Sequence, residues 1–133
     1  MKANELMIGD WVKIKTYGVS DKYEKTEAYI YVEVAEIGSG LITIEYNNEI
    51  KEPHRICEYT EIEPIPLTLE ILEKNGFVVE SRYCFGNPLL YCVLVDGLWI
   101  DISGENYFEG KLEYVHQLQQ ALRLCGIEKE IIL

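Results

Sequence analysis

The fold is decided by the stretch Leu89-Leu90-Tyr91-Cys92-Val93-Leu94-Val95-Asp96-Gly97-Leu98-Trp99-Ile100-Asp101-Ile102. Two apolar runs meet at Asp96-Gly97, a dipeptide that suits a two-residue type I′ turn with φ > 0 at both central positions. We therefore predict a β-hairpin that closes at this turn. In that register three apolar pairs share one face: Val95 with Leu98, Val93 with Ile100, and Tyr91 with Ile102.

The opposite face of this hairpin is also largely apolar. It would carry Leu90, Cys92, Leu94, Trp99 and Asp101. An apolar sheet face must be buried against another element. The sequence therefore predicts that the hairpin is covered on both sides.

Neighbouring segments predict further strands beside the hairpin. Residues 77–85, followed by the turn Gly86-Asn87-Pro88, predict an antiparallel strand that completes a three-stranded meander. Residues 107–114 leave two alternatives open, a fourth strand or the first turn of the following helix. Residues 130–133 form a possible short terminal strand.

Two helices are predicted in the second half of the chain. Thr68 as N-cap and Gly76 as C′ residue define a short helix over residues 69–75. From Val115 onward, apolar residues recur at spacings of three and four, which is the pattern of an amphipathic helix. This second helix ends before Gly126.

Alternating strands in the first half predict a small β-barrel of the SH3 type. Gly9-Asp10 turns the chain into a strand that starts at Trp11. In residues 28–37, Ile30, Val32 and Val34 share one face, while Tyr29 and Tyr31 share the other. Residues 41–46 form the next strand, and residues 62–65 return to close the barrel.

Two connections complete this half. Residues 16–27 are polar and predict a long loop. A three-residue loop, Asn47-Asn48-Glu49, is preferred to a two-residue turn because it pairs Tyr46 with Ile50 and keeps the apolar face together. Pro53 would end that strand, because proline cannot donate to a ladder.

The predicted fold class is α+β. An SH3-like β-barrel spans residues 1–66, and a small antiparallel sheet with two helices spans residues 67–133 and packs against it. The stiff connector Pro64-Ile65-Pro66 marks the division.

Charge excludes some partners. The 133 residues include 12 Lys and Arg against 23 Asp and Glu, for a net charge of −11. Binding to nucleic acid or to an anionic membrane requires clustered cations, so neither is expected, whereas a basic protein partner is allowed. Residues 1–6 have no apolar signal region, and the sequence predicts a cytoplasmic protein.

Possible catalytic and metal-binding residues are few. His54 and Cys57 are residue types used in zinc sites and cysteine proteases, but a zinc site needs three or four ligands. Cys84 and Cys92 would have to complete it. His116 could serve as a general base beside a suitable partner. We expect no metal, no cofactor and no catalytic residue.

Ten tyrosines are the most unusual feature of the composition. SH3-type barrels bind peptides through exposed aromatic side chains, and tyrosine offers a large contact area at low entropic cost. Tyrosines also populate barrel faces for packing alone. The candidate partner-binding residues are Tyr17, Tyr23, Tyr29, Tyr31 and Tyr59.

Three stretches of the chain carry a family resemblance. They are residues 1–12, with Ile8-Gly9-Asp10-Trp11-Val12; residues 62–77, from Ile62-Glu63-Pro64 to Asn75-Gly76-Phe77; and residues 114–126, which open with Tyr114-Val115-His116. Together they resemble a family of small uncharacterised proteins of anaerobic gut bacteria and their phages or mobile elements. The resemblance implies no activity and no catalytic residue.

Three functional hypotheses follow. The leading one is a non-catalytic binding or adaptor module that recognises a protein or peptide partner. The second is an acidic decoy that mimics nucleic acid and is carried on a phage or mobile element, based on the net charge of −11. The third is a small enzyme that uses Cys57 or His116.

Overall fold

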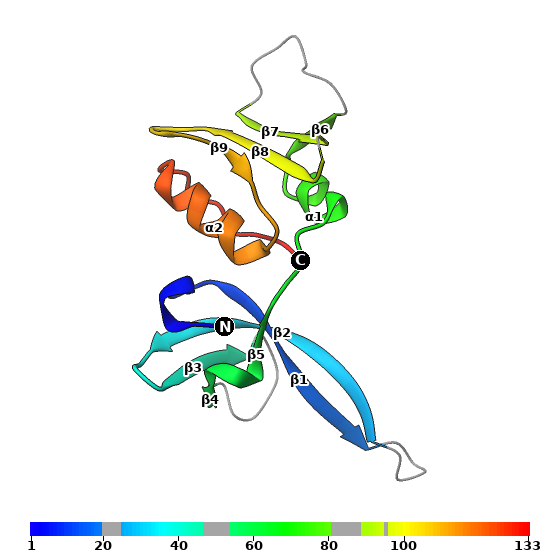
Figure 1. Cartoon of the computed structure of the whole chain (residues 1–133), viewed down its shortest axis with the longest axis vertical. Helices are drawn as coiled ribbons and strands as arrows, with labels where there is room; N and C mark the ends of the chain where they lie inside the picture. The colour runs from blue at the N-terminus through cyan, green and yellow to red at the C-terminus, as the bar shows by residue number, and fades with distance from the viewer. Residues whose placement is uncertain (20–24, 47–53, 81–88, 95) are drawn as a thin grey trace. The chain divides into compact units, whose positions relative to one another are not determined.

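The structure is a computed structural model that describes residues 1–19, 25–46, 54–80, 89–94 and 96–133 (Figure 1). For residues 16–19, 25–28 and 80 it describes the backbone alone. The chain divides into two compact units, Met1–Ile65 and Pro66–Leu133. The fold class is α+β, as predicted, with mostly antiparallel sheets and two α-helices.

The first unit is a five-stranded antiparallel sheet in the order β4-β3-β2-β1-β5. Its strands are β1 (Trp11–Val19), β2 (Lys25–Ile37), β3 (Leu41–Tyr46), β4 (His54–Glu58) and β5 (Ile62–Pro64), with short 3₁₀ turns η1 (Ala3–Glu5) and η2 (Tyr59–Glu61). As predicted, β5 returns to pair beside β1. Over the described residues no pairing joins β4 with β5, so the predicted closed barrel is not found.

Alternation along β2 places its side chains as predicted. Val32 and Val34 are buried, and Ile30 packs against the same core, whereas Tyr29 and Tyr31 are exposed. Ile42 and Ile44 of β3 complete this core together with buried side chains from the other strands. These are Leu6, Val12, Ile14, Cys57 and Ile62.

The predicted long loop at residues 16–27 is wrong. β1 and β2 continue to pair from Lys15↔Tyr29 as far as Val19↔Lys25, and Figure 1 shows them as a long two-stranded ribbon. β5 pairs with β1 only at Val12–Ile14, and β3 pairs with β2 only from Val32 onward. No third strand lies beside this ribbon among the described residues, so polar residues suit it.

The strand that pairs with β3 extends past the point where the sequence predicts its end. Within the described residues β3 pairs with β4, from Leu41↔Glu58 to Glu45↔His54, whereas the sequence predicts that this strand ends at Pro53. The predicted loop at 47–49 and the pairing of Tyr46 with Ile50 lie outside the described residues.

The second unit contains a four-stranded sheet in the order β6-β7-β8-β9. Its strands are β6 (Val78–Glu80), β7 (Leu90–Leu94), β8 (Leu98–Ser103) and β9 (Tyr107–Lys111), and its helices are α1 (Leu69–Lys74) and α2 (Val115–Leu124). Of the two alternatives for residues 107–114, the strand is found over residues 107–111, and the helix begins only at Val115. Figure 1 shows α2 running beneath this sheet.

The predicted meander is wrong at its first strand. β6 pairs with β7 in parallel, with Val78 opposite Tyr91 and Glu80 opposite Val93. Apolar character alone does not distinguish a parallel partner from an antiparallel one. The predicted turn at 86–88 lies outside the described residues.

The central hairpin forms, but its register differs from the prediction by one residue. Leu94 pairs with Leu98 and Cys92 with Ile100, so three residues rather than two separate the strands. Asp96 and Gly97 do have positive φ, at 51° and 117°. The sequence does not distinguish these two registers, because both faces of β7 are apolar.

Helix ends follow their local signals. The Thr68 hydroxyl accepts a hydrogen bond from the Ile71 amide at 3.3 Å, and Gly76 has φ 84°. Gly126, with φ 75°, follows α2. Residues 130–133 form no strand. They are held instead by Asn75, whose side chain exchanges two hydrogen bonds with the backbone of Ile132 at 2.7 and 2.8 Å.

Candidate functional site

Two predicted binding residues lie together on the outer face of the first sheet. Tyr29 and Tyr31 are two positions apart on β2, so their side chains share the face opposite the core. They are 45% and 48% exposed. Lys13 of β1 lies directly opposite Tyr31, and Glu63 of β5 lies opposite Lys13. We call Lys13, Tyr29, Tyr31 and Glu63 the tyrosine face.

Lys13 organises the tyrosine face. Its ammonium nitrogen lies 4.5 Å from the centroid of the Tyr29 ring, a cation–π geometry. The same nitrogen is 4.0 Å from Glu63 Oε2. The side chain is therefore held between an aromatic ring and a carboxylate, and the face offers aromatic area together with both signs of charge.

The remaining predicted tyrosines do not join this face. Tyr59 in η2 packs against the core, and its hydroxyl donates to the Gly38 carbonyl oxygen at 2.5 Å. Tyr17 lies on β1 opposite Glu27 in the backbone register, and its side chain is not described. Tyr23 lies outside the described residues.

The His54 and Cys57 pair does not converge. Both residues lie on β4, and their odd separation of three positions sends the side chains to opposite faces of the strand. His54 is exposed and Cys57 is buried in the core. Burial raises the pKa of the Cys57 thiol, which disfavours the thiolate that a nucleophile requires.

Cys92, Cys125 and His116 are buried in the second unit. Cys92 and Cys125 have pKa values raised by burial. His116 in α2 is 4% exposed and stacks on Tyr114, with ring centroids 5.8 Å apart. Cys84 lies outside the described residues. Within the described part of the chain, no three His, Cys, Asp or Glu side chains gather as a metal site would require.

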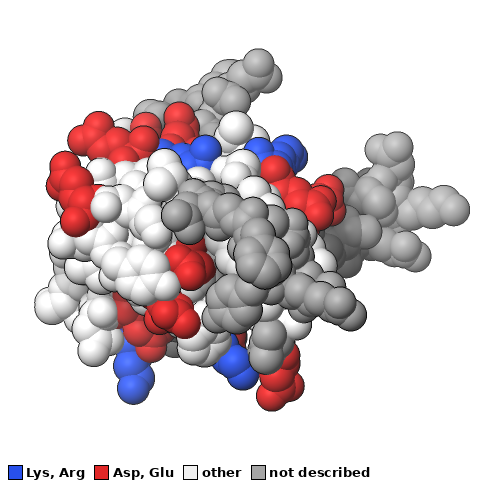
Figure 2. Space-filling view, turned by 90° about the horizontal axis from the view of Figure 1, so that it is seen from above, with Lys and Arg blue, Asp and Glu red and all other residues white. Residues whose placement is uncertain are grey.

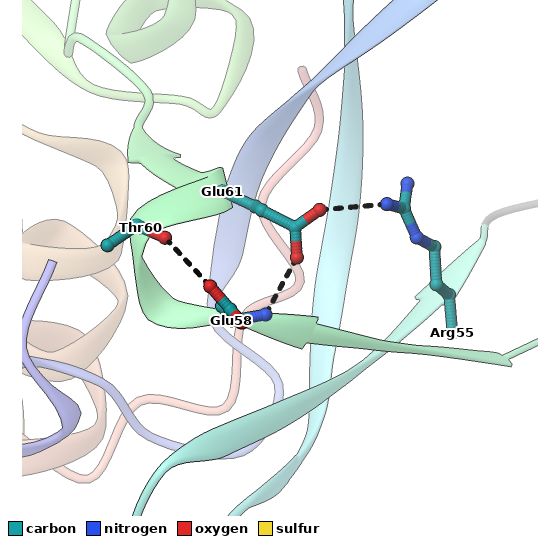
Figure 3. Close-up of polar contacts among 4 residues, drawn as sticks. All are labelled: Arg55, Glu58, Thr60 and Glu61. Carbon is teal, nitrogen blue, oxygen red and sulfur yellow. Dashed lines mark hydrogen bonds and ion pairs between the residues drawn. The ribbon is translucent and has the colours of Figure 1, made fainter.

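An Arg55–Glu61 ion pair joins β4 to η2 (Figure 3). Arg55 Nη2 donates to Glu61 Oε1 at 2.9 Å, and the other oxygen of Glu61 accepts from the Glu58 amide at 2.7 Å. Thr60 donates to the Glu58 carboxylate at 3.5 Å. These contacts fix a tight turn, which gives them a structural role.

A second polar cluster carries no signal in the sequence pattern and was not predicted. The Tyr107 hydroxyl on β9 lies 2.9 Å from Asp101 Oδ2 and 3.0 Å from Glu109 Oε2. The indole nitrogen of Trp99 donates to Glu109 Oε1 at 3.2 Å. These four residues are the Tyr107 cluster. The hydrogen bond to Asp101, followed by burial and the bond to Glu109, raises the pKa of the Tyr107 phenol.

Charge on the surface is mixed on the face that Figure 2 shows. Acidic side chains stand at several separate places, and Lys or Arg side chains lie near some of them. Neither helix in the described residues has the length and apolar character of a membrane span. The tyrosine face and the Tyr107 cluster each combine aromatic area with fixed charge.

Comparison with protein-family models, with curated proteins and with solved structures finds no match to this chain. The functional argument therefore depends on the residues of the chain itself.

Proposed function

We propose that this chain is a non-catalytic binding or adaptor module that recognises a protein or peptide partner through the tyrosine face. The observation that carries the proposal is the paired exposure of Tyr29 and Tyr31, at 45% and 48%, on a strand whose other face is buried. Exposed tyrosines are enriched where interfaces gain most of their binding energy. Lys13 and Glu63 supply charged groups that would orient a partner.

The strand order supports an SH3-like arrangement of the first unit as part of this proposal. Five strands lie in the order β4-β3-β2-β1-β5, and the last strand returns beside the first, as the sequence predicts for such a unit. Domains of this kind bind extended peptides on aromatic-lined surfaces. We place the module in the cytoplasm and in the family of gut bacterial and phage proteins that it resembles.

The test is partner capture with matched variants. The parent chain, the double variant Tyr29→Ala/Tyr31→Ala and the control Met7→Ala/Ile8→Ala would each be used to capture proteins from a bacterial lysate. The control removes two side chains of the same unit that are 47% and 66% exposed but lie outside the tyrosine face. Captured proteins would then be purified and titrated to obtain a Kd.

We expect the tyrosine variant to weaken binding by about tenfold or more, because loss of a central aromatic contact often costs about 2 kcal/mol. The control should bind like the parent. Equal binding by the parent and the tyrosine variant would reject the tyrosine face as the site. Failure to capture any protein in repeated attempts would count against the binding module itself.

The decoy and enzyme hypotheses remain predictions. The burial of Cys57 and its raised thiol pKa give no support to a catalytic thiolate. No observation on the described residues favours either hypothesis over a binding module.

A further inference from the structure

Among the described residues, strand β9 has one backbone edge with no strand beside it. At one end the Gly104 amide donates to the Asn106 carbonyl oxygen at 3.0 Å, and at the other the Leu112 amide donates to the Leu98 carbonyl oxygen at 3.2 Å. Backbone direction alternates along a strand, so the even-numbered residues of β9 face β8. The amides and carbonyls of Tyr107, Glu109 and Lys111 therefore point to the outer edge, where the described residues place no further strand.

The Tyr107 cluster lies beside this edge. Tyr107 is 58% exposed, and its hydroxyl holds the Asp101 and Glu109 carboxylates on one face of the sheet. The two donors in the cluster, the phenol and the indole of Trp99, are neutral, so neither cancels a negative charge. The ammonium nitrogen of Lys111 lies 3.9 Å from Asp96, so Lys111 pairs with a carboxylate outside the cluster.

We propose that the β9 edge binds an extended basic segment of another protein by strand addition. Backbone hydrogen bonds to Tyr107, Glu109 and Lys111 would supply the affinity. Glu109 on β9 would select Lys or Arg on the added strand, because opposite charges on neighbouring strands attract. Asp101, which lies opposite Glu109 on β8, would add to the attraction for the same cation. This interaction lies on the second unit and does not depend on the tyrosine face.

Charge favours a basic segment over a second copy of the chain as the partner that binds the β9 edge. Antiparallel pairing of two β9 strands centred on Glu109 would place the two Glu109 carboxylates opposite each other, which is destabilising. Each copy also carries a net charge of −11, which repels another copy and attracts a cation-rich partner.

The other sheet edges suit strand addition less well. β5 and β6 are three residues long, against five for β9. At β4, the cationic Arg55 stands beside the edge and is paired with Glu61. Among the strands at the ends of the two sheet orders, β9 combines length with uncompensated carboxylates.

The experiment is a nuclear magnetic resonance titration of the full chain with a synthetic peptide. The probe is a capped seven-residue peptide that alternates Lys with Val or Thr. One control peptide carries Glu in place of Lys, and another is N-methylated at alternate amides, so that it keeps its charge but cannot donate to an edge. We expect the Lys peptide to shift the backbone amides of residues 107–111 and the indole signal of Trp99, and neither control peptide to do so.

Variants of the chain separate the contribution of the carboxylate charges from that of the backbone hydrogen bonds. Asp101→Asn/Glu109→Gln should weaken binding of the Lys peptide by about threefold or more, since exposed charge pairs contribute about 0.2–1 kcal/mol each. Lys111→Pro should weaken it by removing an edge donor, whereas Lys111→Ala removes the same charge and should not. If Lys111→Pro does not fold, the N-methylated peptide tests the same hydrogen bonds.

Several outcomes would overturn the proposal. These are equal binding of the Lys and Glu peptides, unchanged affinity in the carboxylate variant, shifts confined to the tyrosine face, or no shift at residues 107–111. Self-association of the parent chain in sedimentation, with loss of free β9 amides, would assign the edge to a second copy and would also refute it.

Discussion

β2 and β7 are both central strands, yet their sequences specify their pairing to different degrees. In β2 burial alternates, with Val32 and Val34 inside and Tyr31 outside. In β7 three successive residues, Tyr91, Cys92 and Val93, are all at most 5% exposed. A shift of β2 by one residue would expose its whole apolar set, whereas the same shift in β7 exchanges one apolar face for another. Alternation therefore fixes a register, and hydrophobicity alone does not.

The largest expected effect comes from placing a charge in each strand. Val32→Asp should destabilise the chain by about 4 kcal/mol or more, because an unpaired carboxylate would be buried in the core. Tyr31→Asp, one position away, should cost about 1 kcal/mol or less. In β7, both Cys92→Asp and Val93→Asp should be as damaging as Val32→Asp. Urea denaturation followed by circular dichroism measures all four, and a mild effect at either β7 position would contradict burial on both faces.

Asn75 makes hydrogen bonds to a distant segment of the chain, and no local sequence pattern predicts them. Its side chain is 2% exposed and bonds both Ile71 and Ile132. Asn75→Ala should cost about 2–3 kcal/mol in the free energy of unfolding, because backbone groups of the C-terminal segment lose their partners. Asn106→Ala is the matched control, since that exposed side chain makes one bond, to the Leu124 carbonyl oxygen. Equal losses for the two variants would show that the buried hydrogen bonds of Asn75 stabilise the chain no more than one exposed bond does.

The hairpin turns of the two sheets can be compared directly. Gly97 in the second sheet has φ 117°, whereas Gly40 in the first sheet has no positive φ and open space where a Cβ atom would lie. Gly97→Val should cost roughly 1–3 kcal/mol from backbone strain, and Gly40→Val should cost less. Asp96→Asn should be nearly neutral, because Asn also tolerates the left-handed region. Thermal melts that rank Gly40→Val as the worse variant would contradict this expectation.

The smallest expected effect is a loss of stability at alkaline pH. Burial raises the pKa of the Cys57 and Cys92 thiols above the ordinary value of 9.0. Below pH 9 both states are protonated and this contribution is fully present. Above it the unfolded chain ionises first and binds fewer protons, so the free energy of unfolding falls until the folded thiols ionise too.

The measurement is the slope of the unfolding free energy between pH 9 and 10.5 under reducing conditions. Each thiol should contribute at most about 1.4 kcal/mol per pH unit. Cys57→Ala should give a shallower slope than the parent, whatever its stability at neutral pH. A slope unchanged by this substitution would show that the Cys57 thiol does not contribute to the pH dependence.

The sequence predicted one of the two candidate surfaces and missed the other, because alternation along a single strand is visible in a sequence and pairing between strands is not. Alternation along one strand was enough to expose Tyr29 and Tyr31 together. The Tyr107 cluster joins residues of β8 and β9, and its residues meet only because Asp101 lies opposite Glu109. The sequence left residues 107–114 open between strand and helix, so it offered no signal for that pairing.

The sequence by itself determined the features that depend on a few neighbouring residues. These include the Thr68 cap, the glycines that follow both helices, the faces of β2 and the positive φ values at Asp96 and Gly97. Each results from local sterics, hydrogen bonding or the two-residue period of a strand.

Tertiary structure alone decided the parallel pairing of β6, the choice of β4 as partner of β3, the length of the β1–β2 ribbon and the hairpin register. In these cases several pairings satisfy the local pattern nearly equally. The free energy that selects among them comes from burial against segments distant in the chain, which no local pattern contains.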